Sequence, residues 1–261
     1  MIITFLSDYG LTDGFVGVCH GVILSACPEA VVIDVTHGVP RGDVRAGALI
    51  LSGAMPYLPV GVHLAVVDPG VGSDRRAVAL RTLDGRRFVG PDNGLLSLCF
   101  DAVGGVVEAV DIGRSPFALE PVSATFHGRD IFAPVAGRLA GGVSLGEVGE
   151  PCDPEGLVRL EMPRPSVEDG VLVAHATYLD RFGNVQLDAE ALALQPGKSV
   201  AISVRGESWP GVYGRTFGDA PVGDLIVYED SDGRLAVAVN QGSAVERLGI
   251  SVGDELRIAP G

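Results

Sequence analysis

Apolar and polar positions alternate in two different ways along the chain, and the first pattern covers residues 1–162. Short apolar runs rich in β-branched residues are separated by segments whose apolar residues recur at helical spacing. The predicted elements are a strand over residues 2–6, a helix over 15–26, a strand over 31–35, a helix from Asp43 to Leu51 and a strand over 63–67. Thr12 or Asp13 can cap the first helix, and Asp43 can cap the second. This alternation predicts an α/β domain with a mostly parallel central sheet.

The pattern changes at residues 162–165, where two prolines in four residues indicate a linker. Beyond it come short β-type runs, punctuated by Gly, Asp and Pro, at residues 171–179, 199–204, 225–228 and 235–239. Such runs predict a small antiparallel barrel or sandwich. We therefore expect two domains, an α/β domain over residues 1–162 and a smaller all-β domain over residues 163–261.

Composition narrows the function classes. With 47% hydrophobic residues the chain can bury a large core, yet no apolar run reaches the roughly 20 residues of a membrane helix. Lys and Arg total 19 against 33 Asp and Glu, a formal net charge of −14, which argues against a surface that follows nucleic-acid phosphates. The first residues lack a basic signal-peptide segment, and the four cysteines show no zinc or disulfide spacing. We expect a cytoplasmic protein with free thiols and no metal site, membrane anchor or nucleic-acid partner.

Candidate chemistry gathers where predicted strands end, because ligands of open α/β sheets bind outside the carboxyl ends of the strands. Asp8 follows the first strand and can hold two vicinal ribose hydroxyls, or it forms an ordinary turn. Asp68 follows the strand over residues 63–67, and a loop can bring it to Arg75, although a turn residue and a surface arginine explain them equally well. His127 stands at an expected helix N-terminus, which lowers its pKa and suits proton transfer; a capping or core histidine is the alternative.

The predicted all-β domain offers a second group of candidates. Asn184 carries both a donor and an acceptor, which suits the Watson–Crick edge of adenine. Phe182 and Phe217 can lie on either side of a ring, and Asp180 can pair with an ammonium group. A hairpin turn with ordinary core phenylalanines explains the same residues.

Three other motifs indicate different chemistry and are weak matches. Residues 142–146 fit a nucleophile elbow but follow a predicted helix, where the elbow needs a strand. Lys198, the chain's single lysine, stands in a poor match to a phosphate-binding loop. Residues 242–256 resemble part of a PDZ module, which gives a peptide-binding alternative of a different class.

Taken together, ordered motifs along the whole chain resemble the S-adenosyl-L-methionine hydroxide adenosyltransferase family, the relatives of the bacterial fluorinase and chlorinase. The motifs are SDYG at residues 7–10 with Asp13, DVTH at 34–37, DPGVG at 68–72 with Arg75, PDNGL at 91–95, TFHGRD at 125–130, FGNV at 182–185 with Asp180, and NQGS at 240–243. The resemblance implies an α/β N-terminal domain, a β-barrel C-terminal domain and a homotrimer. It also implies active sites between the N-terminal domain of one subunit and the C-terminal domain of its neighbour.

The resemblance also implies roles for individual residues. Asp68, Arg75 and His127 match the Asp-Arg-His triad of the hydrolysing members, whereas fluorinase has Tyr at the position of Asp68 and Tyr-Ser at those of His127 and Gly128. The long fluorinase insertion is absent, and relatives carry an aromatic residue where this chain has Gly42. The implied substrate-binding residues are Asp8, Asp13, Phe126, Gly128, Asp180, Phe182, Asn184, Phe217, Ser231, Val239, Asn240 and Ser243.

The implied activity is hydrolysis of S-adenosyl-L-methionine to adenosine and L-methionine, with an activated water or hydroxide attacking ribose C5′ in an SN2 reaction. The sulfonium is a built-in leaving group, since its departure gives a neutral thioether, and no cofactor is expected. The demanding part is to hold the nucleophile in line with C5′ and away from bulk water. Two alternatives stay open: a halide-using adenosyl transferase and a nucleoside-binding protein without catalysis.

Overall fold

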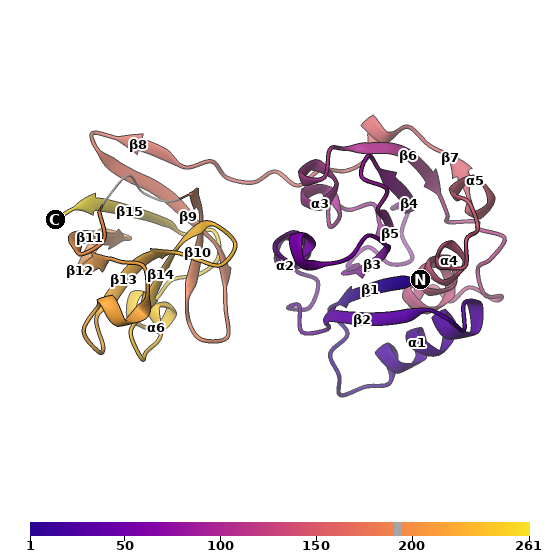
Figure 1. Ribbon diagram of the computed structural model, residues 1–261, viewed down its shortest axis with the longest axis horizontal. Helices are drawn as coiled ribbons and strands as arrows, with labels where there is room; N and C mark the ends of the chain where they lie inside the picture. The colour runs from indigo at the N-terminus through magenta and orange to yellow at the C-terminus, as the bar shows by residue number, and fades with distance from the viewer. Residues whose placement is uncertain (191–194) are drawn as a thin grey trace. The chain divides into compact units, whose positions relative to one another are not determined.

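The protein, seen in a computed structural model that describes residues 1–190 and 195–261, divides into two compact units, Met1–Leu160 and Glu161–Gly261 (Figure 1). Each unit has its own hydrophobic core. None of the described helices has the length and hydrophobicity that a membrane span requires.

The first unit is built on a seven-stranded sheet with the strand order β2-β1-β3-β5-β4-β6-β7. The strands are β1 (Ile2–Ser7), β2 (Val31–Thr36), β3 (Val62–Val66), β4 (Ala77–Thr82), β5 (Arg87–Pro91), β6 (Val106–Asp111) and β7 (Glu150–Pro151). Strands β2, β1, β3, β5 and β6 run in one direction, and β4 and β7 run against them. The predicted α/β domain with a mostly parallel sheet is therefore confirmed.

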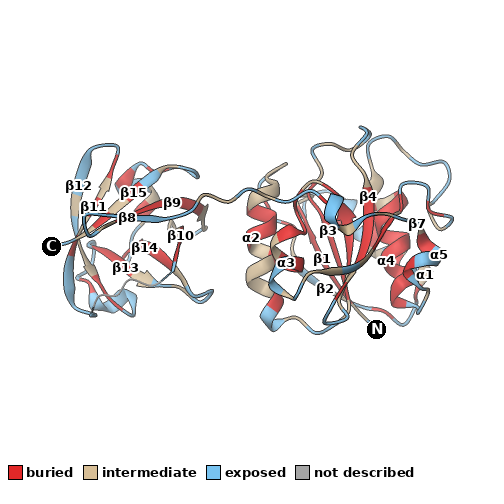
Figure 2. Ribbon diagram, turned by 90° about the horizontal axis from the view of Figure 1, so that it is seen from above, coloured by how far each residue is buried: buried red, intermediate tan, exposed pale blue. Residues whose placement is uncertain are grey.

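Helices cover both faces of this sheet, α1 and α4 on one side and α2 and α3 on the other (Figure 2). They are α1 (Phe15–Ala26), α2 (Val44–Ala54), α3 (Ser97–Ala102), α4 (Ala133–Ala140) and α5 (Leu145–Val148), with short 3-10 turns η1 (Met55–Tyr57) and η3 (Pro154–Gly156) and a π-helical turn η2 (Gly128–Phe132) that runs into α4. The apolar positions of α1, including Val16 and Ile23, pack with Phe132 and Leu139 against Phe5 of β1. The three- and four-residue spacing read from the sequence thus places one face of α1 in the core.

The two expected helix caps have different outcomes. Asp43 caps α2 as predicted, since its Oδ1 accepts a hydrogen bond from the Ala46 N–H at 2.9 Å. The predicted cap of α1 by Thr12 or Asp13 is wrong, because Gly14 occupies the N-cap position and no side chain caps the helix. Both Thr12 and Asp13 lie before the cap position and are exposed to solvent.

The second unit is a closed barrel of seven antiparallel and parallel strands in the cyclic order β9-β10-β14-β13-β12-β11-β15. Its elements are β8 (Ser166–Glu168), β9 (Val171–Leu179), β10 (Val185–Glu190), β11 (Lys198–Val204), β12 (Glu207–Tyr213), β13 (Leu225–Glu229), β14 (Arg234–Val239), β15 (Glu255–Pro260), the 3-10 turn η4 (Phe217–Asp219) and α6 (Ala244–Leu248). Pairing of β9 with β10 closes the ring, and β8 extends the sheet at β9. The predicted barrel is confirmed, and alternate residues such as Leu225 and Val227 fill its interior.

Candidate active site

The catalytic candidates lie at one edge of the first unit's sheet. Asp68 follows the carboxyl end of β3, and Arg75 precedes β4, which runs antiparallel to its neighbour β5. An antiparallel strand begins where its parallel neighbours end, so the loop between β3 and β4 returns to the same edge. His127 immediately precedes the π-helical turn η2, at the helix N-terminus that the sequence predicted.

The structure brings Asp68, Arg75 and His127 into direct contact. Arg75 Nε donates to the two carboxylate oxygens of Asp68 at 2.9 and 3.1 Å, and Nη2 donates to Oδ2 as well. The same Nη2 lies 2.9 Å from Nδ1 of His127. The Asp68 and Arg75 side chains are only 6% and 11% exposed, so the pair is shielded from bulk water. A bidentate, nearly buried ion pair of this kind fixes the guanidinium in place.

This geometry determines which nitrogen of His127 carries the proton. A guanidinium has only donors, so Nδ1 must accept the hydrogen bond from Arg75 and cannot hold a proton. The neutral ring then carries its proton on Nε2. Burial, and next the charge of Arg75, lower the pKa of His127, while Asp68 and Asp130 oppose that shift. Burial and Arg75 therefore favour the neutral imidazole that the sequence analysis attributed to the helix N-terminus.

Aromatic rings and a glycine shape the neighbourhood of His127. Phe126 packs edge-on against Tyr9 and Phe15, at centroid distances of 5.7 and 5.2 Å. A Cβ atom on Gly128 would lie 2.0 Å from the Tyr9 hydroxyl oxygen, so a side chain does not fit there without a shift of Tyr9. Burial raises the pKa of Tyr9 well above its ordinary value, which keeps its hydroxyl protonated. Phe126 and Gly128 thus form a preorganised wall beside the cluster.

The other candidates of the first unit are placed differently. Asp8 follows β1 at the same edge of the sheet, and its Oδ2 accepts a hydrogen bond from the Gly42 N–H at 2.8 Å. Gly42 has a φ of +72°, a conformation that favours glycine and that presents this N–H to Asp8. Asp13 is exposed in the loop before α1. Arg75 and His127 line a cleft of about 690 Å³ together with Ser73 and Arg114.

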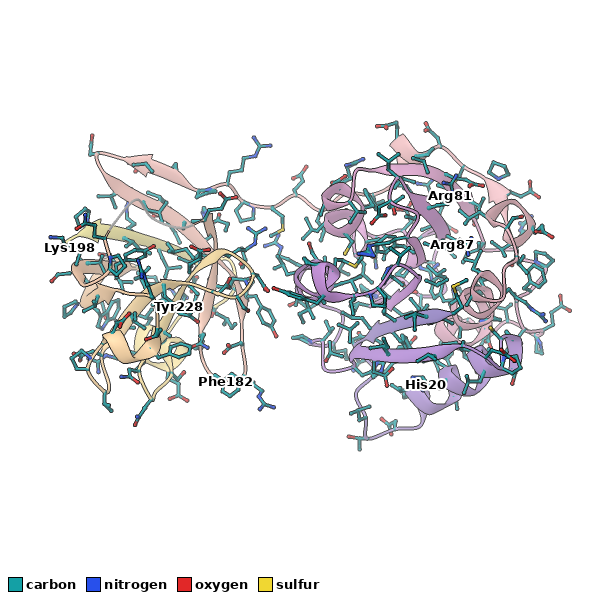
Figure 3. All side chains as sticks on the ribbon, viewed as in Figure 1. His20, Arg81, Arg87, Phe182, Lys198 and Tyr228 are labelled. Carbon is teal, nitrogen blue, oxygen red and sulfur yellow. The ribbon has the colours of Figure 1, made fainter. Side chains whose placement is uncertain are left out.

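The barrel carries a larger cleft, of about 1100 Å³, over neighbouring strands β9, β10, β14 and β13 and the loops beside them. Seven of the eight candidates from this unit line it: Asp180, Phe182, Asn184, Phe217, Ser231, Val239 and Asn240. The eighth, Ser243, instead caps α6, where its hydroxyl accepts a hydrogen bond from the Glu246 N–H at 3.1 Å. Phe182 and Phe217 are 66% and 46% exposed, so they are not the core phenylalanines of the alternative interpretation. Figure 3 shows the Phe182 ring projecting away from the barrel at a loop tip.

Within this cleft the polar candidates bond to one another. Asp180 Oδ1 accepts from the backbone N–H groups of Phe182 and Asn184, and its Oδ2 accepts from Nδ2 of Asn184 at 2.7 Å. Both backbone groups of Asn240 are paired as well, with Asp224 and Gly223. An adenine edge or an ammonium group would have to share or replace these bonds.

Sequence reasoning missed Tyr228 as a cleft residue. It was read as part of an apolar strand, but it lies on the outer face of β13, opposite Ala236 of β14, and its ring contacts Phe217 at 5.1 Å. Burial, then the nearby Asp230 and Asp180, raise the pKa of Tyr228 to about 12. The period-two pattern of β13 does not reveal it, because Ile226, on the same face as Tyr228, is buried like Leu225 and Val227 on the opposite face.

An Asp-Arg-His cluster beside a cleft on an α/β sheet and an aromatic-lined cleft on a β-barrel are the features of a two-domain enzyme for a nucleoside-like substrate, and the comparisons agree. Residues 3–149 match the family model of the SAM hydroxide adenosyltransferase N-terminal domain, and residues 174–257 match that of the C-terminal domain. The chain belongs to this family. The match over residues 174–257 overturns the peptide-binding alternative for residues 242–256.

Individual relatives give the same result. The chain is 52% identical to a Salinispora tropica protein named (R)-S-adenosyl-L-methionine hydrolase, over 99% of this chain and 98% of that protein. A Nocardia brasiliensis protein named fluorinase is 29% identical over 100% of this chain and 97% of its own. A crystal structure of an uncharacterized conserved protein from Thermotoga maritima superposes with a TM-score of 0.92, at 36% identity and coverage of 98% and 99% of the two chains.

Proposed function

We propose that this chain hydrolyses (R)-S-adenosyl-L-methionine to adenosine and L-methionine. The observation that carries the proposal is the Asp68–Arg75–His127 cluster, which is already assembled and shielded. Support comes from the relative of that name at 52% identity, against 29% for a fluorinase. The epimer at sulfur is taken from the relatives' names.

The reaction needs a positioned nucleophile more than it needs an acid. A water oxygen forms a bond to C5′ of the ribose, the C5′–S bond breaks, methionine leaves as a neutral thioether, and one proton is released. Because the sulfonium is already activated, no cofactor is required. Holding the water in line with C5′ and free of bulk solvent is then the main source of rate.

The three cluster residues divide this task. As the water loses a proton to solvent, His127 directs its Nε2–H toward the resulting hydroxide and stabilises its negative charge before it attacks C5′. Arg75 holds His127 in this tautomer and adds its own positive charge. Asp68 keeps Arg75 in place through the bidentate ion pair. Since Nε2 already carries a proton, His127 acts as a donor to the nucleophile, and it does not accept the proton that the water loses.

The remaining candidates bind the substrate. Asp8, Asp13, Phe126 and Gly128 hold the ribose side, with Asp8 on the hydroxyls. In the barrel, Phe182 and Phe217 pack against adenine, Asn184, Val239 and Asn240 read its edge, and Asp180 and Ser231 hold the methionine amine and carboxylate. Ser243, expected to join them, caps α6 and supports the neighbouring loop. The acidic groups of the barrel cleft, which include Asp180, Asp230 and Asp232, suit a substrate that carries positive charge.

We also propose a cytoplasmic homotrimer whose active sites combine the N-terminal unit of one subunit with the barrel of its neighbour. An apolar surface on α1 and the edge strand β2 supports an oligomer, because large side chains are exposed there: Phe15, Val18, Leu24, Val31 and Ile33. Light scattering of the purified protein should give three times the mass of the chain. A monomer with full activity would contradict the shared site.

The activity is tested by incubating the protein with each sulfonium epimer separately and separating the products by liquid chromatography. We expect adenosine and methionine in equal amounts, from the R epimer. Adenine or S-adenosylhomocysteine without adenosine would reject hydrolysis at C5′. Parallel reactions with chloride and fluoride address the halide alternative, which requires 5′-halo-adenosine, and binding without turnover would support the nucleoside-binding alternative.

A further inference from the structure

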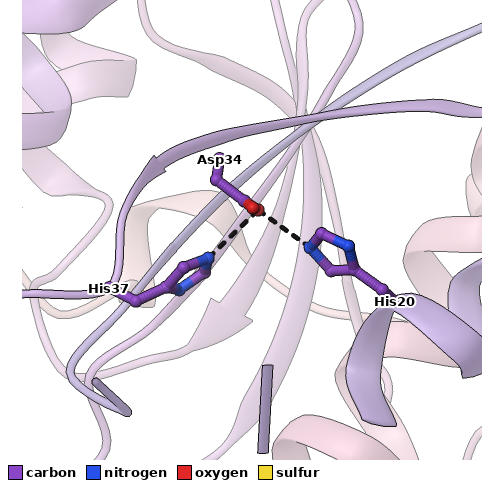
Figure 4. Close-up of side chains that lie close together, drawn as sticks. All are labelled: His20, Asp34 and His37. Atoms are coloured by element: carbon purple, nitrogen blue, oxygen red, sulfur yellow. Dashed lines mark hydrogen bonds and ion pairs between the residues drawn. The ribbon is translucent and has the colours of Figure 1, made fainter. Parts of the chain in front are cut away.

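Three potential metal ligands converge outside the proposed active site, at the outer edge of the first unit's sheet (Figure 4). His20 projects from α1, Asp34 from the edge strand β2, and His37 from the turn that follows β2. Nε2 of His20 lies 2.8 Å from Oδ1 of Asp34, and Nε2 of His37 lies 3.0 Å from the same oxygen. All three ligand atoms lie within 4.8 Å of one another.

The contact of His37 with Asp34 is close but is not a hydrogen bond. The His37 side chain is only 2% exposed, and its Nδ1 is paired with the Ser7 hydroxyl at 2.7 Å. Its Nε2 is buried and makes no hydrogen bond among the described residues, although Oδ1 of Asp34 is 3.0 Å away. A buried nitrogen without a hydrogen bond is costly, and an ion shared with Asp34 would give it a partner.

The donor set and its spacing fit a transition-metal ion. Two imidazole nitrogens and one carboxylate oxygen are ligands of zinc and of other divalent first-row metals. Bonds of about 2.0–2.2 Å place neighbouring ligand atoms about 3 Å apart around a six-coordinate ion and about 3.4 Å apart around a tetrahedral one. The separations of 2.8 and 3.0 Å, the first of them a hydrogen bond in the metal-free chain, are short enough for an ion to bind with a small outward movement of the side chains.

The surroundings are also those of a usable site. In the single chain, Asp34 and His20 are 40% and 29% exposed, which leaves room for water ligands. Ser7 fixes the ring of His37 from behind, as outer partners do at metal-binding histidines.

We propose that His20, Asp34 and His37 bind one divalent transition-metal ion of the zinc type. The ion ties α1 to the edge strand β2 and to the loop that carries Asp8. That loop depends on the same residues, because the His37 carbonyl accepts the Gly10 N–H at 2.8 Å and the Ser7 hydroxyl accepts the Tyr9 N–H at 3.3 Å. The expectation of no metal rested on the spacing of cysteines and histidines along the chain, and these ligands come together only through the fold.

The test uses untagged protein treated with a chelator and then titrated with Zn²⁺ by calorimetry and with Co²⁺ by visible absorption. We expect one ion per chain, Co²⁺ bands typical of nitrogen and oxygen ligands, and a higher Tm with Zn²⁺. Mg²⁺ should give no comparable effect, because imidazole ligands disfavour it. Absence of Zn²⁺ binding would overturn the proposal.

Single substitutions test whether His20 and Asp34 are ligands of the bound ion. His20→Asn and Asp34→Asn should each weaken Zn²⁺ binding by more than about 100-fold, since even loss of an outer partner costs roughly 10–100-fold. His175→Asn is the matched control: His175 pairs with Asp188 at 2.8 Å, but among the described residues it belongs to no three-ligand group. Unchanged binding in the first two variants, with their Tm in chelator equal to that of the parent, would refute the assignment. These readouts do not depend on the proposed hydrolysis.

Discussion

The two candidate regions differ in how far they are organised before a substrate arrives. In the first unit, Asp68 and Arg75 are nearly buried and locked by an ion pair, and His127 is fixed by Arg75. In the barrel, Phe182 is two-thirds exposed, and Asp180 and Asn184 satisfy each other. The rigid cluster is suited to chemistry, and the barrel loop is suited to recognition that rearranges on binding. Changes in the first region should therefore affect kcat, and changes in the second should affect KM.

The largest effect is expected from His127→Ala. Loss of the Nε2–H that we propose donates to the nucleophile should lower kcat by about 10³-fold, while KM changes little, because substrate contacts remain. Steady-state kinetics with the R epimer measure both constants. His175→Ala, a histidine of the barrel, serves as the control and should keep the parent values. A His127→Ala variant with near-parent kcat would remove His127 from the mechanism.

Arg75→Met should come next, with kcat about 100-fold lower and a changed pH profile. In the parent, burial and Arg75 hold the pKa of His127 below its ordinary value of 6.5, so the acid limb of the kcat profile should lie below that pH. Without the cation at position 75, Asp68 and Asp130 favour protonation of His127, so the acid limb of the profile should move to higher pH. Arg75→Lys keeps a positive charge and should keep the limb in place. If the acid limb of kcat lies at the same pH in the parent, Arg75→Met and Arg75→Lys, then Arg75 does not control the pKa of His127.

Low pH should destabilise the first unit, because His63 is protonated more readily in the unfolded chain than in the folded one. This ring is fully buried beside Phe88, its Nδ1 is 2.8 Å from the Thr4 hydroxyl, and burial lowers its pKa from 6.5 to about 4. Below pH 6.5 the unfolded chain binds the proton more readily, so stability is complete above pH 6.5 and falls until about pH 4. The loss at pH 5 is about 2 kcal/mol. Urea unfolding at pH 7 and pH 5 measures this loss of unfolding free energy. In His63→Gln the free energy of unfolding should depend less on pH. If the parent and the variant lose equal stability between pH 7 and pH 5, groups other than His63 cause the loss.

The smallest effect is expected in the barrel. Phe182→Ala and Phe217→Ala each remove a ring from the cleft and should raise KM about 10-fold with little change in kcat, since stacking of a base on an aromatic ring contributes about 1–3 kcal/mol. Tyr57→Ala removes an equally exposed aromatic from the other unit and is the control. A fall in kcat without a rise in KM in either variant would contradict the assignment of catalysis to the first unit and of substrate binding to the barrel.

Sequence patterns predicted those parts of the molecule that depend on neighbours along the chain. The helix over residues 15–26, the cap at Asp43 and the return of the loop from Asp68 to Arg75 follow from local spacing and strand direction. The pairing of Asp180 with Asn184 and the position of Tyr228 were not predicted, because they depend on how a turn satisfies its own polar groups and on which face of a strand is covered. The convergence of His20 and His37 on Asp34 joins a helix to a sheet edge, and spacing alone does not reveal it.

The central claim is that the shielded cluster directs water to C5′, and oxygen-18 tests it most directly. The reaction is run in H₂¹⁸O with the R epimer, and adenosine and methionine are analysed by mass spectrometry. We predict one ¹⁸O atom in the 5′-hydroxyl of adenosine and none in methionine. Adenosine without the label would contradict attack by water at that carbon.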